Sequence, residues 1–275
     1  MKKLKNKFIL LLLIVVVSFA VNFMGCSKND ESLKVLNEYY NNIKSNNFDS
    51  SYEYLSSASK NIWTKEKYKE WESISMEVLQ FKEVKIKKSN ESKDKELDGI
   101  KYEDVVEYST TETHHDNYNN KDINSDYTIY IVKENGEWKI CRKKEDPKEN
   151  IAVVKAELAV MYVNGKGKNK DLGQAEDILE KSIEENPDYS SSYYLLGLIY
   201  DEVQRYDDAI NCEQQCVDKS KNEKDKSNGY CVLGETYENK KGSSSAKEYY
   251  EKALEANPDN QDAKEKLAKL NLKSQ

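Results

Sequence analysis

Residues 193–209 read YYLLGLIYDEVQRYDDA, and residues 230–246 read YCVLGETYENKKGSSSA. Five residues of the first stretch recur in the second with a constant shift of 37 positions. The pairs are Tyr193 with Tyr230, Leu196 with Leu233, Gly197 with Gly234, Tyr200 with Tyr237, and Ala209 with Ala246. A fixed period of this length indicates stacked helical hairpins, each of which buries its apolar face against the next. The C-terminal half is therefore expected to be an all-α helical repeat.

The small residues at repeated positions fit two helices that pack closely, because glycine and alanine keep no bulky side chain between the helix axes. Tyr250, Ala253 and Pro258 complete the pattern in the second copy. These spacings resemble the tetratricopeptide repeat, a helical hairpin of about 34 residues. The resemblance implies three repeats at about 150–188, 190–225 and 227–258. A capping helix is expected over 259–272, with its lysines facing solvent.

The first repeat has a longer turn, which resembles that of the SEL-type relatives of the same repeat. Gly165 and Gly167 are expected to adopt positive φ, and Asp171 is expected to cap the following helix. The second repeat departs from the pattern, because Glu213 stands where an aromatic residue is usual. Its charged connection over 219–226 predicts a loose joint to the third repeat.

By the same resemblance, the first helix of each repeat lines a concave groove that binds a partner. The family's groove positions fall on the expected partner-binding residues Tyr194, Leu198, Asp201, Glu235 and Glu238. An acidic groove favours a protein or peptide with a basic or amide-rich segment. A merely solvated acidic face is an equal alternative. The lysine and asparagine set with which chaperone-binding members hold a peptide carboxylate is missing from these positions.

Residues 31–146 follow a different pattern, in which helical spacing gives way to strand alternation. Apolar residues recur at three and four positions between Leu33 and Ile43, and with period two after Met76. Asn135-Gly136 is a strong hairpin signal. Two or three helices followed by four strands predict an α+β domain with helices packed on a curved antiparallel sheet. This order resembles the nuclear transport factor two-like cone fold, which hosts enzymes, ligand pockets and interaction modules.

A small-ligand or hydrolytic site in this cone-shaped domain, with the repeats as a spacer, is the alternative function. Its candidate polar groups are Asp104 and His114, with His115 and Asp116 nearby. The adjacent histidines are expected in a polar hairpin loop, and residues 87–95 in a solvated connection between strands. No nucleophile is placed beside them, so we predict that the chain is not an enzyme.

The first 26 residues have the layout of a signal peptide. Lysines precede an apolar run that is shorter than the roughly 20 residues of a spanning helix, and the stretch ends in Gly25-Cys26. This ending resembles a bacterial lipoprotein signal, although Phe23 stands where the family usually has leucine. The resemblance implies acyl chains such as palmitate on Cys26, a tether over 27–30, and an extracytoplasmic protein of the cell envelope that is anchored to the membrane by lipid. A retained membrane helix is the alternative.

Composition excludes several classes of protein. A length of 275 residues favours two modest domains over one large core. The formal net charge of −7 opposes binding to phosphate backbones, so no nucleic acid partner is expected. Only 10 glycines leave little material for a phosphate-binding loop, and no cofactor or metal is predicted.

Four cysteines follow Cys26, namely Cys141, Cys212, Cys216 and Cys231. Cys212 and Cys216 lie one helical turn apart, which is too far for a disulfide between them. A bridge from one of these two to Cys231 and a set of small buried thiols are equal alternatives. The spacing does not favour a zinc site.

Overall fold

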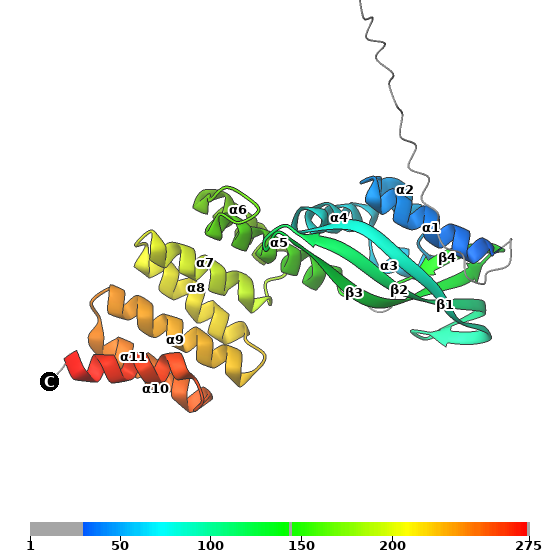
Figure 1. Cartoon of the computed structure of the whole chain (residues 1–275). Helices are drawn as coiled ribbons and strands as arrows, with labels where there is room; N and C mark the ends of the chain where they lie inside the picture. Colours follow the sequence, from blue (N-terminus) through cyan, green and yellow to red (C-terminus); the bar gives the residue numbers. More distant parts are fainter. Residues whose placement is uncertain (1–29, 143–144, 274–275) are drawn as a thin grey trace, which may run out of the picture. The chain divides into compact units, whose positions relative to one another are not determined.

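The computed structural model describes residues 30–142 and 145–273. The predicted signal peptide and Cys26 lie outside these ranges. From Glu31 onward the chain forms one compact unit. Its described residues run through four helices, four strands and seven further helices (Figure 1). This order confirms the predicted fold class, an α+β domain followed by an all-α repeat. No helix in the described ranges is long and apolar enough to span a membrane.

Four helices open the α+β domain. They are α1 (Glu31–Lys44), α2 (Phe48–Glu53), α3 (Ser57–Ile62) and α4 (Lys65–Val78). The hydroxyl of Ser56 caps α3 by accepting from the N–H of Ser59, and Thr64 caps α4 by accepting from the N–H of Lys67. The short α3 adds one helix to those expected, because six residues are too few to show helical periodicity.

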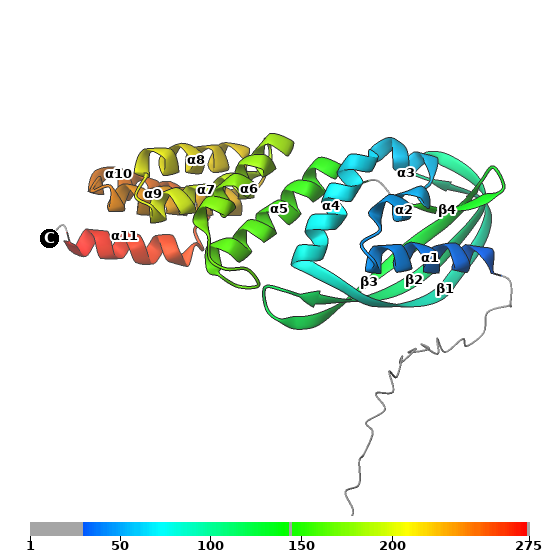
Figure 2. The ribbon, with the colours of Figure 1, turned by 90° about the horizontal axis from the view of Figure 1, so that it is seen from above.

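The four strands form one antiparallel sheet in the order β1-β2-β3-β4. They are β1 (Leu79–Leu97), β2 (Ile100–Asp116), β3 (Lys121–Glu134) and β4 (Glu137–Cys141). The predicted hairpin is confirmed, because Asn135 and Gly136 both adopt positive φ between β3 and β4. Helices α1 to α4 cover one face of the sheet (Figure 2).

The sheet is longer than the sequence indicated. Residues 87–95, expected as a solvated connection, belong to β1 and pair with β2, so that prediction was wrong. The ladder satisfies the backbone of this segment while its charged side chains stay in water. Cross-strand ion pairs of Lys93 with Asp104 and of Lys95 with Glu107 add to the pairing.

The prediction of a loop at the two histidines was also wrong. His114 pairs with Phe81 on β1 and with Ile123 on β3, so both histidines lie within β2. The polar turn comes later, over residues 117–120, and ends with Asn120 at a φ of 52°. Because successive strand residues face opposite sides, His114 and His115 point away from each other.

Aromatic side chains fill the core between helices and sheet. Trp63, Tyr68 and Tyr108 are fully buried there. They pack with Leu36 and Ile131 in a cluster that Ile151 completes. The many tyrosines of this half therefore serve first as core residues.

Seven helices build the repeat half. They are α5 (Pro147–Asn164), α6 (Leu172–Glu185), α7 (Ser190–Glu202), α8 (Tyr206–Lys219), α9 (Glu223–Asn239), α10 (Ser243–Ala256) and α11 (Gln261–Lys273). The expanded first turn is confirmed, with Gly165 and Gly167 at φ values of 64° and 70°. Asp171 caps α6 by accepting from the N–H of Gln174 at 3.0 Å.

The joint between the second and third repeats is shorter than predicted. Helix α8 ends at Lys219 and α9 begins at Glu223, so most of the segment expected as a long connection is helical. Asn222 caps α9 by accepting from the N–H of Asp225. Ser220 between the helices is buried and donates to the carbonyl of Cys216. These contacts argue against a loose joint.

Two glycines set the close packing within the repeats. A Cβ added to Gly234 would lie 2.5 Å from the ring of Tyr250, and one added to Gly197 would lie 2.7 Å from Cγ of Glu213. Glu213 and Tyr250 occupy equivalent positions of successive repeats. The second repeat therefore buries a carboxyl group where the third buries a phenol ring.

Candidate functional site

Helices α7 and α9 carry the residues expected to bind a partner. Tyr194, Leu198 and Asp201 are spaced by four and three positions on α7, so they share one helix face. Leu198 is 38% exposed, and Tyr194 is half-buried. Burial, with a contribution from nearby Glu235, raises the pKa of the Tyr194 phenol. The structure thus brings the apolar face of α7 next to the acidic face of α9.

Each of the three acidic residues expected to bind a partner contacts a neighbouring side chain. Asp201 accepts a hydrogen bond from the side-chain amide of Asn239 at 2.8 Å, which joins α7 to α9. Glu238 accepts from the hydroxyl of Tyr250 at 3.2 Å. Glu235 forms a 2.7 Å ion pair with Lys266 of the capping helix. The expectation that the lysines of that helix all face solvent was therefore wrong at Lys266.

Glu213 lies close to Asp201 and Glu235 in a buried position. It is 1% exposed, and one carboxyl oxygen accepts from the hydroxyl of Thr236 at 2.8 Å. The other oxygen has no partner among the described residues. Burial, aided by the charges of Asp201 and Glu235, raises the pKa of Glu213 to about 8. The sequence marked Glu213 as a departure from the repeat pattern, and the structure shows that the departure places an ionisable group in the repeat core.

The four described cysteines are free thiols. Cys141, Cys216 and Cys231 are buried, and Cys212 is partly buried. Burial raises the pKa of the Cys212 and Cys216 thiols to about 11. Of the two alternatives left by the sequence, the structure has the small buried thiols. Cys231 is part of the hydrophobic core of the third repeat.

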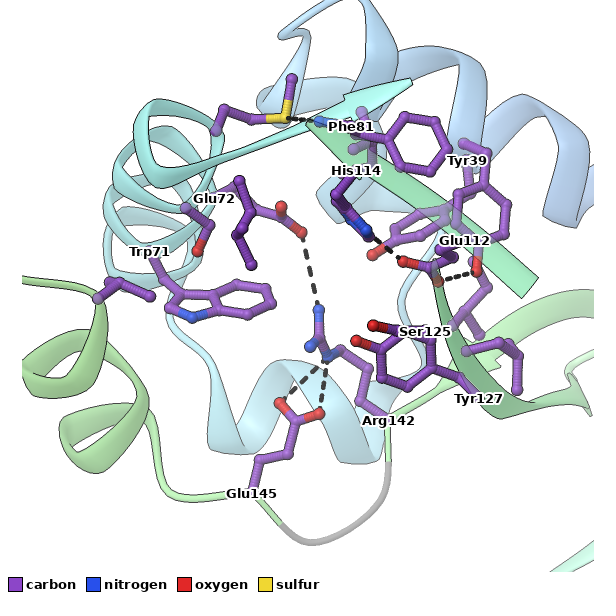
Figure 3. Close-up of a pocket in the computed structure, with 18 of the residues that line it drawn as sticks. Tyr39, Trp71, Glu72, Phe81, Glu112, His114, Ser125, Tyr127, Arg142 and Glu145 are labelled. Carbon is purple, nitrogen blue, oxygen red and sulfur yellow. Dashed lines mark hydrogen bonds and ion pairs between the residues drawn. The ribbon is translucent and has the colours of Figure 1, made fainter. Parts of the chain in front are cut away.

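A second candidate site is a cavity of about 470 Å³ beside the sheet. This volume lies within the range of small-molecule sites. Aromatic side chains line it from α1, α4, β1 and β3. Acidic and basic groups line it from α4, β2 and the segment after β4 (Figure 3), and Glu157 of α5 adds a further carboxyl group. Its aromatic wall consists of Tyr39, Tyr40, Trp71, Phe81, Tyr127 and Tyr130.

Arg142 is the positive centre of this cavity. Its Nε donates to both carboxylate oxygens of Glu145 at 3.1 Å, and its Nη1 lies 3.7 Å from Glu72 (Figure 3). The guanidinium also stacks on Trp71, with 4.5 Å between its carbon and the ring centroid. The indole of Trp63 donates to Glu145 at 2.8 Å. Two carboxylates and two indoles therefore hold Arg142 in place.

Glu112 and His114 are placed on another side of the cavity (Figure 3). The hydroxyl of Tyr40 donates to Glu112 at 2.6 Å, and His114 Nε2 lies 3.5 Å from the other carboxylate oxygen. Burial raises the pKa of Glu112 and lowers the pKa of His114. His114 is consequently neutral near pH 7. Among the described residues, no lysine or arginine lies within ion-pair distance of Glu112.

Glu72 is buried on the inner face of α4. Burial raises its pKa to about 7, against the opposing effect of the Arg142 charge. A carboxyl group with this pKa is partly protonated under ordinary conditions. The cavity therefore holds two acidic groups, Glu72 and Glu112, whose charges are poorly stabilised by their surroundings.

The sequence identified only part of this cavity. His114 lines the cavity, but Asp104 does not. Asp104 lies on a distant part of β2, where it pairs with Lys93 of β1. His115 points elsewhere and contacts Asp122 at 2.7 Å, and Asp116 caps the turn by accepting from the N–H groups of Tyr118 and Asn119. Glu72, Glu112 and Arg142 were missed. Their one available signal was a charged residue on a face otherwise occupied by buried aromatics.

Two family models of the tetratricopeptide repeat match the chain, one over residues 178–211 and one over 227–260. The C-terminal half therefore carries tetratricopeptide repeats, the class of helical repeat that the spacing predicted. The search of curated proteins found no match.

Solved structures that are similar to part of this chain include a tetratricopeptide domain. The first such domain of Spaghetti (RPAP3), bound to the HSP90 peptide SRMEEVD, is 20% identical, with a TM-score of 0.39 over 44% of this chain and 91% of that one. The N-terminal domain of stress-induced protein-1 from C. elegans is 16% identical, with a TM-score of 0.41 over 46% of this chain and 99% of that one.

Proposed function

We propose that the chain is a protein-interaction module whose repeat groove binds a basic segment of a partner. The observation that carries the proposal is the face shared by α7 and α9, where exposed Leu198 and half-buried Tyr194 adjoin the carboxylates of Asp201 and Glu235. An apolar contact beside carboxylates suits a peptide that alternates lysine or arginine with apolar residues. Tetratricopeptide repeats form extended concave surfaces that bind partners.

The proposal is tested with two fluorescein-labelled peptides, SKLKKYK and SELEEYE, which share apolar residues and differ in charge. Anisotropy titrations with the full chain should show at least ~10-fold tighter binding of the lysine peptide, with weakening at higher salt. The isosteric variant Asp201→Asn, Glu235→Gln, Glu238→Gln should lower that affinity about 10-fold, since each exposed charge pair contributes roughly 0.2–1 kcal/mol.

A matched control carries the same charge change away from the groove. Glu184, Glu251 and Glu255 are exposed on α6 and α10, and their replacement by glutamine should leave peptide affinity within about twofold. Equal losses in both triple variants would mean general attraction to an acidic chain. Unchanged affinity in the groove variant would remove the groove assignment.

We also propose that the protein acts on the extracytoplasmic face of a bacterial membrane, anchored by lipid on Cys26. The support is the order of lysines, short apolar run and Gly25-Cys26 in the sequence. Growth of a bacterial host with an alkyne-tagged palmitate analogue should label the full chain, and Cys26→Ser should abolish the label. A label that persists in the serine variant would contradict lipidation at this residue.

A further inference from the structure

The cavity of the α+β domain contains ionisable groups that have no role in the proposed binding of a peptide by the repeats. It is enclosed by aromatic and aliphatic side chains, yet several ionisable groups project into it. Buried charges are costly unless they are paired, so a set of this kind is unusual in a purely structural core. Its arrangement is independent of the repeat surface.

The charges that line the cavity do not balance. Four glutamates, Glu72, Glu112, Glu145 and Glu157, line the cavity with a single arginine, Arg142, and the imidazole of His114 is neutral near pH 7. Arg142 already donates to Glu145 and lies close to Glu72. The groups in direct contact with Glu112 are uncharged, namely the hydroxyl of Tyr40 and His114, and the charge of Arg142 acts on it only from beyond ion-pair distance. The cavity as built therefore has room for one more positive charge.

The aromatic walls of the cavity also suit a positively charged group. Tyr40 and Phe81 stack with 5.5 Å between ring centroids, and the edge of the His114 ring lies against Phe81. Tyr40 and Phe81 both line the cavity. Phe81 is drawn there with Glu112 and Tyr127 in Figure 3. Aromatic faces attract cations, and this domain already uses that attraction where Arg142 stacks on Trp71. A flat or apolar body would fill the rest of the space.

We propose that this cavity binds a small organic cation with an aromatic or apolar body, its protonated amine paired with Glu112 and its body among Tyr40, Phe81 and Tyr127. The cation supplies the directly paired positive charge that Glu112 lacks among the described residues. An anionic ligand would have to displace Glu145 from Arg142 and would approach Glu72 and Glu112, which disfavours it.

The raised pKa values of the two carboxyl groups agree with this assignment. Glu72 faces Tyr39 of α1, Tyr68 of its own helix, Glu112 of β2, and Arg142 and Glu145 after β4. Its pKa of about 7 means that it gains charge as the pH rises from 6 to 8. A bound cation stabilises the charged form, so affinity for the cation should rise over this range.

The test uses three indoles of nearly equal shape, titrated calorimetrically into the full chain in detergent micelles with protein-free micelles subtracted. Tryptamine carries an ammonium group, tryptophol a hydroxyl and indole-3-acetate a carboxylate. At pH 8, tryptamine should bind at least ~10-fold tighter than tryptophol, and indole-3-acetate should bind more weakly than both. Tryptamine affinity should fall several-fold at pH 6.

Variants locate the site. Glu112→Gln should lower tryptamine affinity about 10-fold while leaving tryptophol affinity within about twofold. Glu103→Gln, on the exposed side of the same strand, is the matched control and should change neither. Unchanged tryptamine binding in the Glu112 variant, equal binding of tryptophol, preference for indole-3-acetate, or no binding of tryptamine would each overturn the proposal. The triple groove variant should bind tryptamine normally, which separates this result from that of the peptide experiment.

Discussion

Replacing Arg142 with methionine is expected to lower the free energy of unfolding of the α+β domain by about 3–5 kcal/mol at pH 8. Methionine preserves much of the apolar stem, but it leaves buried Glu72 and partly buried Glu145 without their cation. It also removes the guanidinium that stacks on Trp71 and Trp63. Urea unfolding followed by tryptophan fluorescence measures the effect, because all three tryptophans precede residue 142 and so report on this domain.

The pH dependence of this loss identifies its cause. Glu72 has a pKa of about 7 even with Arg142 present, and without the arginine its pKa should rise further. At pH 5 the group is then protonated and needs no counter-charge, so the loss should be smaller than at pH 8. A loss that is equal at both pH values would indicate that packing, and not charge, accounts for the effect.

Arg205 offers a control, because it has the same kinds of partner, two carboxylates and an aromatic ring, but its side chain is exposed. Its guanidinium pairs with Asp208 and Glu176 and stacks on Tyr200 at 4.1 Å, but the side chain is 48% exposed. Arg205→Met should cost less than about 1 kcal/mol, because water screens the pairs. Its unfolding is followed by circular dichroism, since it lies in the repeats. Similar losses for the two arginines would contradict the role given to burial at Arg142.

The features that the sequence predicted are those with a local signal. The Asn135-Gly136 hairpin depends on two adjacent residues that accept positive φ. The repeats depend on small and aromatic residues at a fixed period, so that each copy supports the interpretation of the other. The turn at Gly165 and Gly167 likewise needs only residues that are close in the chain.

The sequence did not predict the cavity, because its residues are far apart in the chain and only the pairing of the strands brings them together. Glu72 and Arg142 lie in separate elements, and the pairing of β1, β2, β3 and β4 brings them together. A charged residue on an amphipathic helix normally faces water, so the burial of Glu72 contradicts the usual pattern. The strand at 87–95 was missed for a related reason, since lysine and serine are poor strand signals and the ladder with β2 decides the structure.

The second large effect is expected from Glu213→Gln, which should stabilise the repeats by about 4–5 kcal/mol at pH 9. The pKa of Glu213 is raised from 4.5 to about 8 on folding, so the folded state holds the proton more tightly than the unfolded state. Its favourable contribution is complete below pH 4.5 and is lost as the pH rises through 8. Glutamine keeps the shape and an acceptor for Thr236 while removing the charge. The gain should therefore be near zero at pH 4.5 and largest at pH 9.

Thermal unfolding followed by circular dichroism at several pH values measures this gain, with Glu255→Gln on the exposed face of α10 as the control. The equivalent position of the next repeat explains why the site tolerates the change. There Tyr250 packs on Gly234 and donates to Glu238, as residue 213 packs on Gly197 beside Asp201. If the difference between Glu213→Gln and the wild type did not grow with pH, the carboxyl group would already be ionised at low cost. The carboxylates of Asp201 and Glu235 raise the pKa of Glu213. If a basic peptide binds beside them as proposed, it should reduce the difference between wild type and variant at pH 9.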